Sequence, residues 1–165
     1  MTVNTINLRA FLASDTPFAQ SVYASTRAEE MKLVDWSDEQ KDTFLRMQFE
    51  AQTKHYAIHY PQAEYIIIQL ADQPVGRLIV ENRADHYLII DIALLPEYRN
   101  RGIGQTLIED LKKQAVQLKL PLVLRVEFFN PAIRFYQRLG FVKSRKIQIY
   151  HEMVWKPDSS MVWPS

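Results

Sequence analysis

Cysteine is absent from this chain of 165 residues, and glycine occurs four times. The lack of cysteine excludes a thiol nucleophile, a disulfide framework and a cysteine-ligated metal site. No apolar run approaches the roughly 18 residues that a membrane-spanning helix needs, so we expect no membrane partner. The first residues, MTVNTINLRAFLASD, place no basic leader before an apolar block. We therefore expect no secretory signal and a cytoplasmic location.

An excess of charge of one sign is also absent, because 20 basic residues nearly balance 19 acidic ones and the net charge is +1. This balance predicts neither a general attraction for nucleic acid nor an acidic tail. The four histidines show no metal-ligand spacing, so no metal is expected. The length suits one domain with a substantial core, and no repeat or linker divides the chain. We expect residues 1–165 to form a single domain.

The apolar pattern predicts a mixed α/β domain. Residues 17–50 are helical in character, with a break near 35–40 and a new N-cap at Ser37, which gives two helices. The run 86–95 is almost continuously apolar, as expected of a central strand that is buried on both faces. The last residues are expected to form a loose tail. The predicted order is β-α-α-β-β-β-α-β-α-β-β, with strands at 6–13, 63–70, 75–82, 86–95 and 122–129, two more within 141–156, and further helices at 102–119 and 131–140.

Two glycines lie within three residues at the start of the helix at 102, in the stretch RNRGIG (99–104). The first turn of a helix has about four unpaired N–H groups and carries partial positive charge. Glycine at positions 102 and 104 leaves no side chain to block an incoming group, and Arg99 and Arg101 add positive charge. The pattern favours a site for phosphate or pyrophosphate, and a glycine-relieved turn with solvated arginines is the alternative. The glycine spacing fits neither a Walker loop nor the dinucleotide fingerprint.

Two motifs in sequence order resemble those of a known family. The segment DIALLPEYRNRGIGQTLIEDL (91–111) resembles the acyl-CoA-binding signature of the GNAT superfamily of acyl-CoA-dependent N-acyltransferases, with Arg99, Gly102 and Gly104 at the signature positions. The segment NPAIRFYQRLGF (130–141) is similar to the second signature of the family, an Ala-x-x-x-Tyr-x-x-x-Gly-Phe helix. The resemblance implies a GNAT-type α/β fold, in which a mixed, mostly antiparallel central sheet is splayed between strands 4 and 5 and flanked by helices.

The resemblance also implies acetyl-CoA as a co-substrate and assigns parts of the chain to it. The backbone of the fourth strand would pair with the pantetheine arm, as an added strand does. The glycine loop would wrap the pyrophosphate, and a hydroxyl one step into the helix would add a hydrogen bond. The implied cofactor-binding residues are Ile92, Ala93, Leu94, Arg99, Asn100, Arg101, Gly102, Ile103, Gly104, Gln105, Thr106, Asn130 and Phe135.

By resemblance, Tyr136 takes the general-acid position of the family. Coenzyme A leaves as a thiolate with a pKa of about 8.5, by analogy with cysteine, and a tyrosine with a pKa of about 10 still holds its proton at pH 7. A tyrosine that only packs on the core beside Phe135 is the alternative.

The second motif departs from the family at its asparagine. Family members usually place this residue three positions before the alanine, but here Asn130 precedes Ala132 by two and Phe129 fills the usual position. Asn130 either reaches the cofactor or caps the helix ahead of Pro131.

The acceptor amine needs a base or a water chain, because a lysine-like amine with a pKa of about 10.4 is almost entirely protonated at pH 7. The family often places a glutamate on the fourth strand, and here Asp91 is the single carboxylate of that strand. Asp91 is therefore one candidate base, and its alternative role is to hold a strand bulge through a backbone bond. Glu127 on the fifth strand is the second candidate, with a surface-facing side chain as its alternative.

The leading interpretation is an N-acetyltransferase that moves an acetyl group from acetyl-CoA to a primary amine by direct attack. A different acyl-CoA donor and a non-catalytic acyl-CoA-binding module are the alternatives, and the presence of Tyr136 favours an enzyme over such a module. The expected partners are a small-molecule or peptide amine acceptor and, as an option, a second copy of the chain in a homodimer. The net charge of +1 and the lack of an aromatic-basic RNA motif argue against nucleic acid.

Overall fold

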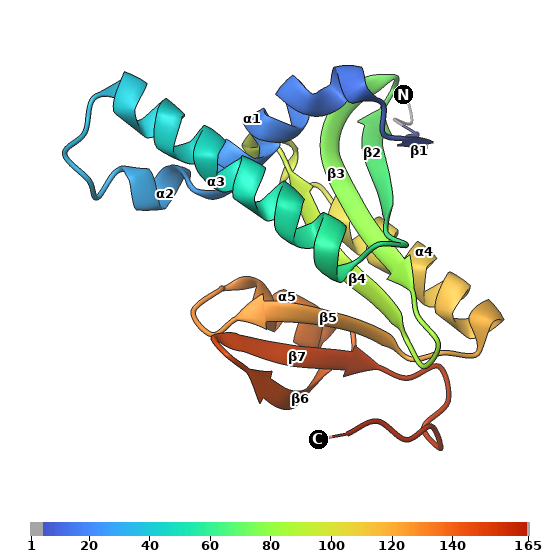
Figure 1. Ribbon diagram of the computed structural model, residues 1–165. Coiled ribbons are helices and arrows are strands. Elements are labelled where there is room, and N and C mark those ends of the chain that lie inside the picture. The colour runs from blue at the N-terminus through green and yellow to red at the C-terminus, as the bar shows by residue number, and fades with distance from the viewer. Residues whose placement is uncertain (1–4, 165) are drawn as a thin grey trace. The chain divides into compact units, whose positions relative to one another are not determined.

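The computed structural model describes residues 5–164. The chain divides into two compact units. The first unit consists of the chain up to Ile79 and of Asp91–Arg99. The second unit consists of Val80–Ile90 and of the chain from Asn100 onward. Strands β3 (Gln73–Asn82) and β4 (Tyr87–Leu94), which are labelled in Figure 1, each contribute residues to both units.

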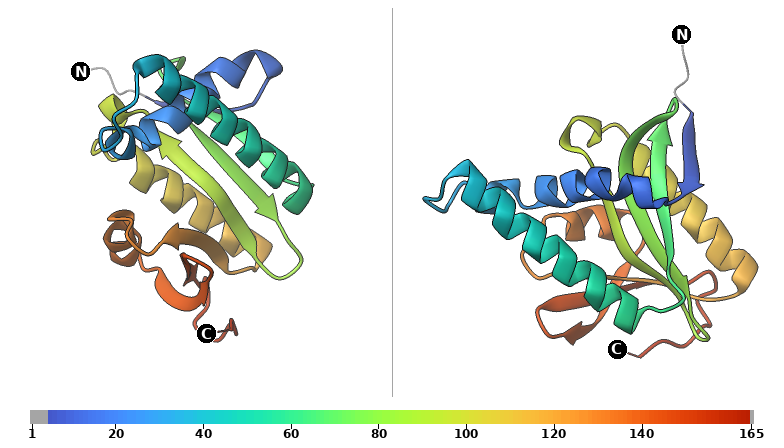
Figure 2. Two further views of the ribbon diagram at one scale, coloured as in Figure 1. Left: turned by 60° about the vertical axis from the view of Figure 1, so that its left-hand side comes forward. Right: turned by 45° about the horizontal axis from the view of Figure 1, so that its top comes forward.

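The first unit combines strands with the N-terminal helices. Strand β1 pairs antiparallel with β2, from Ile6 opposite Leu70 to Ala10 opposite Ile66. Two helices, α1 and α3, lie on one face of β2 and β3 in all views (Figures 1 and 2). The elements that lie in this unit, besides parts of β3 and β4, are β1 (Ile6–Ala10), α1 (Thr16–Thr26), the single turn α2 (Ala28–Met31), α3 (Asp38–His59), β2 (Glu64–Leu70) and two short 3₁₀ turns, Ala13–Asp15 and Pro96–Tyr98.

Helix α3 begins where the sequence predicts a cap. The Ser37 hydroxyl accepts from the Gln40 N–H at 3.1 Å, and the Gln40 side chain accepts from the Ser37 N–H at 3.0 Å, so the two residues form a capping box. The helix then runs to His59, further than the predicted end near 50, because residues 51–59 contain neither glycine nor proline. Its buried residue Phe49 packs edge-on against Tyr23 of α1, with ring centroids 5.9 Å apart.

The second unit contains the parallel strand pair. Residues Tyr87–Ile89 of β4 pair in parallel with Leu122–Leu124 of β5. Strand β5 pairs antiparallel with β7, and β7 with β6. Helix α4 buries one apolar face, which includes Leu107, Leu111 and Ala115. The elements that lie in this unit, besides parts of β3 and β4, are α4 (Ile103–Leu118), β5 (Leu122–Glu127), α5 (Ala132–Arg138), β6 (Val142–Ile147) and β7 (Tyr150–Trp155).

The complete strand order among the described residues is β1-β2-β3-β4-β5-β7-β6, with hydrogen-bonded neighbours. The sheet is mostly antiparallel, with a parallel pair at β4 and β5. This confirms the predicted GNAT-type α/β fold and the predicted element order, to which the structure adds α2. Strand β4 differs from the prediction in one respect, since Tyr87–Ile89 are buried but Ile90–Leu94 are half-buried.

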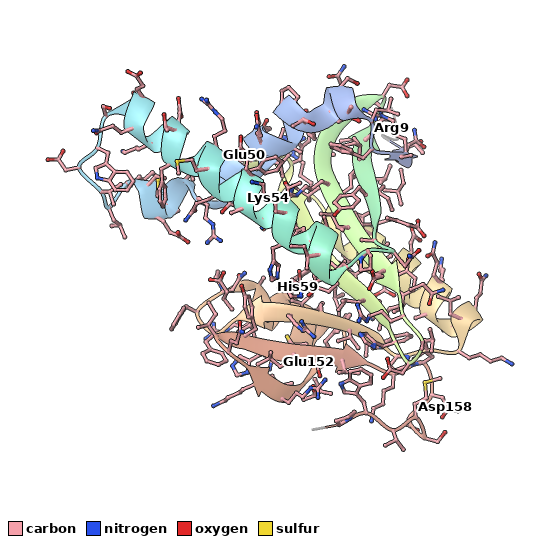
Figure 3. All side chains as sticks on the ribbon, in the orientation of Figure 1. Arg9, Glu50, Lys54, His59, Glu152 and Asp158 are labelled. Atoms are coloured by element: carbon pink, nitrogen blue, oxygen red, sulfur yellow. The ribbon has the colours of Figure 1, made fainter. Side chains whose placement is uncertain are left out.

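The C-terminal segment is anchored, so the expectation of a loose tail is wrong for the described residues. The indole N–H of Trp163 donates to Glu152 Oε1 at 2.8 Å, and the Trp163 ring stands edge-on to His86 at 4.9 Å between centroids. Figure 3 labels Glu152 on β7 and Asp158 in the segment that follows it. The Glu152 side chain is 1% exposed and also accepts from Ser144 and Arg145. A buried carboxylate needs such partners, and the tail supplies one of them.

The buried, hydrogen-bonded carboxylate of Glu152 indicates that the protein loses stability at acidic pH. Burial acts to raise the pKa of the Glu152 carboxyl, but hydrogen bonds from Arg145, Trp163 and Ser144 outweigh burial and hold the pKa below its ordinary value of 4.5. A lowered pKa in the folded state contributes stability above the unfolded pKa and loses it as the pH falls through the folded pKa. Glu152→Gln should lower the free energy of unfolding at pH 7 by about 1–3 kcal/mol, and the difference from wild type should shrink below about pH 4.5.

Denaturant unfolding at pH 7 and pH 3.5 measures this difference. Glu29→Gln is the matched control, because Glu29 pairs with Lys32 and both side chains are exposed. Exposed pairs are worth about 0–1 kcal/mol, so this variant should change little. A pH-independent difference between wild type and Glu152→Gln would contradict the assignment.

Candidate active site

The start of α4 lies in the second unit and carries unpaired backbone donors. Gly102 is the N-cap residue, with φ at 83°, and no side chain caps the helix. The first intrahelical bond runs from the Thr106 N–H to the Gly102 carbonyl at 3.1 Å. The N–H groups of the four residues before Thr106 therefore have no intrahelical acceptor. No side chain caps this helix start, and a positive φ is the conformation that favours glycine.

Space is open over this helix start. A Cβ added to Gly102 would meet no atom within 4 Å, and a Cβ added to Gly104 would lie 3.6 Å from Phe135 Cζ, an ordinary contact. The fold of the unit therefore does not need a bare backbone at Gly104. An anion could approach the N–H groups here, where the helix dipole favours negative charge. Asn100, Arg101, Gln105 and Thr106 are exposed around the same turn.

Thr106 uses its hydroxyl within the helix. Its Oγ1 donates to the Gly102 carbonyl at 3.0 Å. The Thr106 oxygen can still accept a hydrogen bond, but in this conformation its proton is already donated to the Gly102 carbonyl. A donated hydrogen bond from Thr106 to a phosphate, as the resemblance implies, would require the hydroxyl to rotate.

Arg99 ends the first unit, and its side chain is held by that unit. Arg99 Nε donates to the Leu94 carbonyl at 3.0 Å, and Nη2 donates to Ser25 Oγ at 3.3 Å. These bonds connect the turn after β4 to α1. The sequence motif marked Arg99 but gave no indication of Ser25, because Ser25 lies 74 positions away along the chain.

The end of β4, with Ile92, Ala93 and Leu94, is held closely against β3. A Cβ added to Gly76 would lie 2.3 Å from the Ala93 carbonyl oxygen, a distance that no real side chain tolerates. The Leu95 N–H donates to the Val75 carbonyl at 2.8 Å just beyond. Sequence analysis missed Gly76, although an isolated glycine within a strand is a known signal of close backbone approach.

Asp91 forms an ion pair instead of a backbone bond. Its Oδ2 accepts from Arg77 Nε at 2.7 Å and lies 2.6 Å from Nη2, and Gln52 accepts from the same Nη2 at 2.6 Å. Arg77 is 7% exposed. The Asp91 carboxylate is therefore engaged with a buried guanidinium. The sequence offered no signal for this pair, because the two residues are on different strands.

Tyr136 is held by aromatic neighbours in the second unit. Its ring lies 5.3 Å from Phe135 and edge-on to Phe141 at 5.9 Å, between centroids. The Tyr136 carbonyl also accepts from the Phe141 N–H at 3.1 Å. Tyr136 is half-buried. The packing that the alternative interpretation expects is thus present, and it would also fix the orientation of a catalytic hydroxyl.

Glu127 is the last residue of β5, and Asn130 lies between β5 and α5. Asn130 Oδ1 accepts from the Ala132 N–H at 2.9 Å, so Asn130 satisfies a free donor at the start of α5, as the capping alternative expects. Glu127 is half-buried at the end of β5, opposite Tyr150 of β7, and its carbonyl accepts from the Asn130 N–H at 3.0 Å. Roles of Asn130 in cofactor binding and of Glu127 as a base stay predictions.

The site residues predicted from sequence fall into two groups. The first unit holds Asp91, Arg99 and the strand end Ile92–Leu94. The second unit holds the turn 100–106 with Glu127, Asn130 and α5, and it brings Gly104 next to Phe135. Within residues 5–164, no three His, Asp or Glu residues are arranged to hold a metal ion. No helix in the described part of the chain is long and apolar enough to cross a membrane.

Comparisons with known proteins agree with the fold described above. A model of the acetyltransferase (GNAT) family matches residues 24–141. The PaiA N-acetyltransferase of Thermoplasma acidophilum, solved with coenzyme A, is 18% identical with a TM-score of 0.70, over 92% of this chain and 99% of that chain. An acetyltransferase from Thermus thermophilus is 20% identical with a TM-score of 0.67, over 94% and 99% of the two chains.

A spermidine N-acetyltransferase from Vibrio cholerae, solved with CoA and spermine, is 21% identical with a TM-score of 0.61, over 91% of this chain and 94% of that chain. At such identities the structural likeness shows the fold. No curated protein sequence matches the chain. The family match, in contrast, covers more than half of the chain and contains both sequence motifs. The chain therefore belongs to the acetyltransferase (GNAT) family.

Proposed function

We propose that this protein transfers an acetyl group from acetyl-CoA to a primary amine by direct attack. The observation that carries the proposal is the uncapped start of α4, where open space lies over unpaired N–H groups. Hydrogen bonds to charged oxygens are worth about 1.5–3 kcal/mol each, so a few of them can hold a pyrophosphate. The family match and the neighbours solved with CoA support acetyl-CoA as the co-substrate.

The proposal treats residues 1–165 as one catalytic domain. The family match over residues 24–141 includes parts of both units, so neither unit corresponds to the family by itself. In this proposal the backbone of Ile92–Leu94 pairs with the pantetheine, and the turn from Arg99 to Thr106 receives the phosphates.

The chemical step forms one bond and breaks one. The neutral amine nitrogen attacks the thioester carbonyl carbon, a C–N bond forms, and the C–S bond breaks to release coenzyme A. The amine gives up a proton to a base or to water, and the sulfur gains one. We assign the proton donor for sulfur to Tyr136, because a phenol with a pKa of about 10 is still protonated at neutral pH and can donate to the departing sulfur.

Asp91 is more consistent with holding Arg77 than with acting as the base. Asp91→Asn removes the negative charge beside a buried guanidinium, so it should lower the free energy of unfolding by about 1–3 kcal/mol. Turnover should remain within about tenfold of wild type, whereas loss of a general base costs about 10²–10⁴-fold. Unfolding curves and initial rates measure both effects. A stable variant whose turnover falls by more than about a hundredfold would identify Asp91 as the base and contradict this assignment.

A panel of amines tests the proposed function. Acetyl-CoA is offered with spermidine, lysine, an aminoglycoside and a peptide with a free N-terminus, and thiol release is followed with mass analysis of the amine. We expect release above the rate with water alone for at least one amine. Binding of acetyl-CoA without acetylation of any amine would favour the non-catalytic module, and faster release from propionyl-CoA would favour a different acyl donor.

A further inference from the structure

The first unit contains a cavity that none of the residues assigned to acetyl-CoA lines. Its volume is about 110 Å³, and it lies between helices α1 and α3 and the strands β2 and β3. Four aromatic rings form much of its wall, those of Phe11, Phe49, Tyr56 and Tyr65. Thr53 of α3 also lines the cavity and is exposed, so the cavity reaches solvent at α3.

One buried cation, Arg77, joins these aromatic rings in the wall. Arg77 is 7% exposed and stands over the Phe49 ring at 5.6 Å from the centroid. Its hydrogen bonds use Nε toward Asp91 and Nη2 toward Asp91 and Gln52. A guanidinium has five N–H donors. Among residues 5–164, the two donors on Nη1 have no hydrogen-bond partner.

The positive charge of Arg77 is already balanced by Asp91, so the cavity favours a neutral ligand over a charged one. Asp91 neutralises the guanidinium, so a second carboxylate in the cavity would bring an uncompensated negative charge close to Asp91. A buried charge without a partner is costly, whereas a neutral oxygen can accept from Nη1 without such a cost.

We propose that this cavity binds a neutral single-ring aromatic molecule with one carbonyl oxygen, which accepts a hydrogen bond from Arg77. The size agrees, because an engineered cavity of about 150 Å³ holds benzene, and here the open side at Thr53 leaves room for a substituent. The aromatic wall favours stacked or edge-on contacts with a ring. The residues that line the site are distinct from those assigned to acetyl-CoA.

Titration of the full-length protein with benzamide, followed by NMR without acetyl-CoA, tests the site. Toluene is the probe without an acceptor oxygen, and benzoate is the charged probe. We expect benzamide to bind about tenfold more tightly than toluene, since a hydrogen bond from a charged donor contributes to affinity. Benzoate should bind no more tightly than benzamide. Equal binding of toluene, tighter binding of benzoate, or no binding of benzamide would each overturn the proposal.

Two variants of neighbouring residues locate the site. Thr53→Phe places a ring at the open side of the cavity, and because Thr53 is exposed the fold should tolerate it. Lys54→Phe introduces the same ring at the next position of α3 (Figure 3), where the side chain is exposed and does not line the cavity. We expect Thr53→Phe to weaken benzamide binding at least tenfold and Lys54→Phe to leave it within about twofold. Equal affinity in the two variants would place the binding elsewhere and overturn the proposal.

Discussion

Tyr136→Phe should lower turnover by about 10²–10⁴-fold while leaving the affinity for acetyl-CoA unchanged. The substitution keeps the ring, so the contacts with Phe135 and Phe141 that hold it remain. What is lost is the hydroxyl proton that the proposal delivers to the departing sulfur. Initial rates of thiol release and calorimetric titration with acetyl-CoA separate the two quantities.

Tyr60→Phe is the matched control for this prediction. Tyr60 caps the end of α3 and has no place in the proposed reaction, so its turnover should equal that of wild type. The pH profile gives a second readout, because the rate of Tyr136→Phe should no longer fall at high pH where the phenol of wild type ionises. Retention of turnover within about threefold, with acetyl-CoA bound normally, would assign the acid to another residue or to water. A collapse of acetyl-CoA binding would make the hydroxyl structural.

Gly104→Val should weaken acetyl-CoA binding by more than about tenfold, with the protein still folded. The branched side chain would stand among the N–H groups of the first turn of α4, where the proposal places the pyrophosphate. The fold should accept a side chain here, because a Cβ at Gly104 makes an ordinary 3.6 Å contact with Phe135. Replacement of a helical glycine by alanine even adds about 0.5–1 kcal/mol of stability.

The alanine variant therefore separates function from fold at this position. Gly104→Ala should raise the free energy of unfolding and at the same time weaken acetyl-CoA binding, a combination that a purely structural glycine would not give. Gln117→Val, on an exposed position near the other end of α4, is the control and should leave affinity unchanged. Unchanged affinity in folded Gly104→Val would show that the phosphates bind elsewhere.

Local signals in the sequence predicted what depends on neighbours along the chain. The N-cap at Ser37 and the glycine-containing helix start at 102 each depend on residues within a few positions of one another, and the structure contains both. The two motifs also predicted the fold, because their order along the chain and the order of the elements are those of a known family.

Contacts between distant segments were beyond such reasoning. The pair of Arg77 with Asp91 joins residues 14 positions apart, and the bond from Trp163 to Glu152 depends on how the chain returns after β7. Each of these interactions pairs a buried polar group with a partner that no local sequence pattern could identify. Gly76 is an intermediate case, since a lone glycine in a strand signals close approach but does not say that the Ala93 carbonyl is the neighbour.

The most direct test of the central claim follows the acetyl group itself. Acetyl-CoA labelled on the acetyl carbon is incubated with the protein and spermidine, or with whichever amine gives the fastest thiol release. The account predicts that the label moves to the amine nitrogen, with one free thiol formed for each acetyl group transferred. Label that stays on coenzyme A with every amine, or that appears only as acetate, would contradict it.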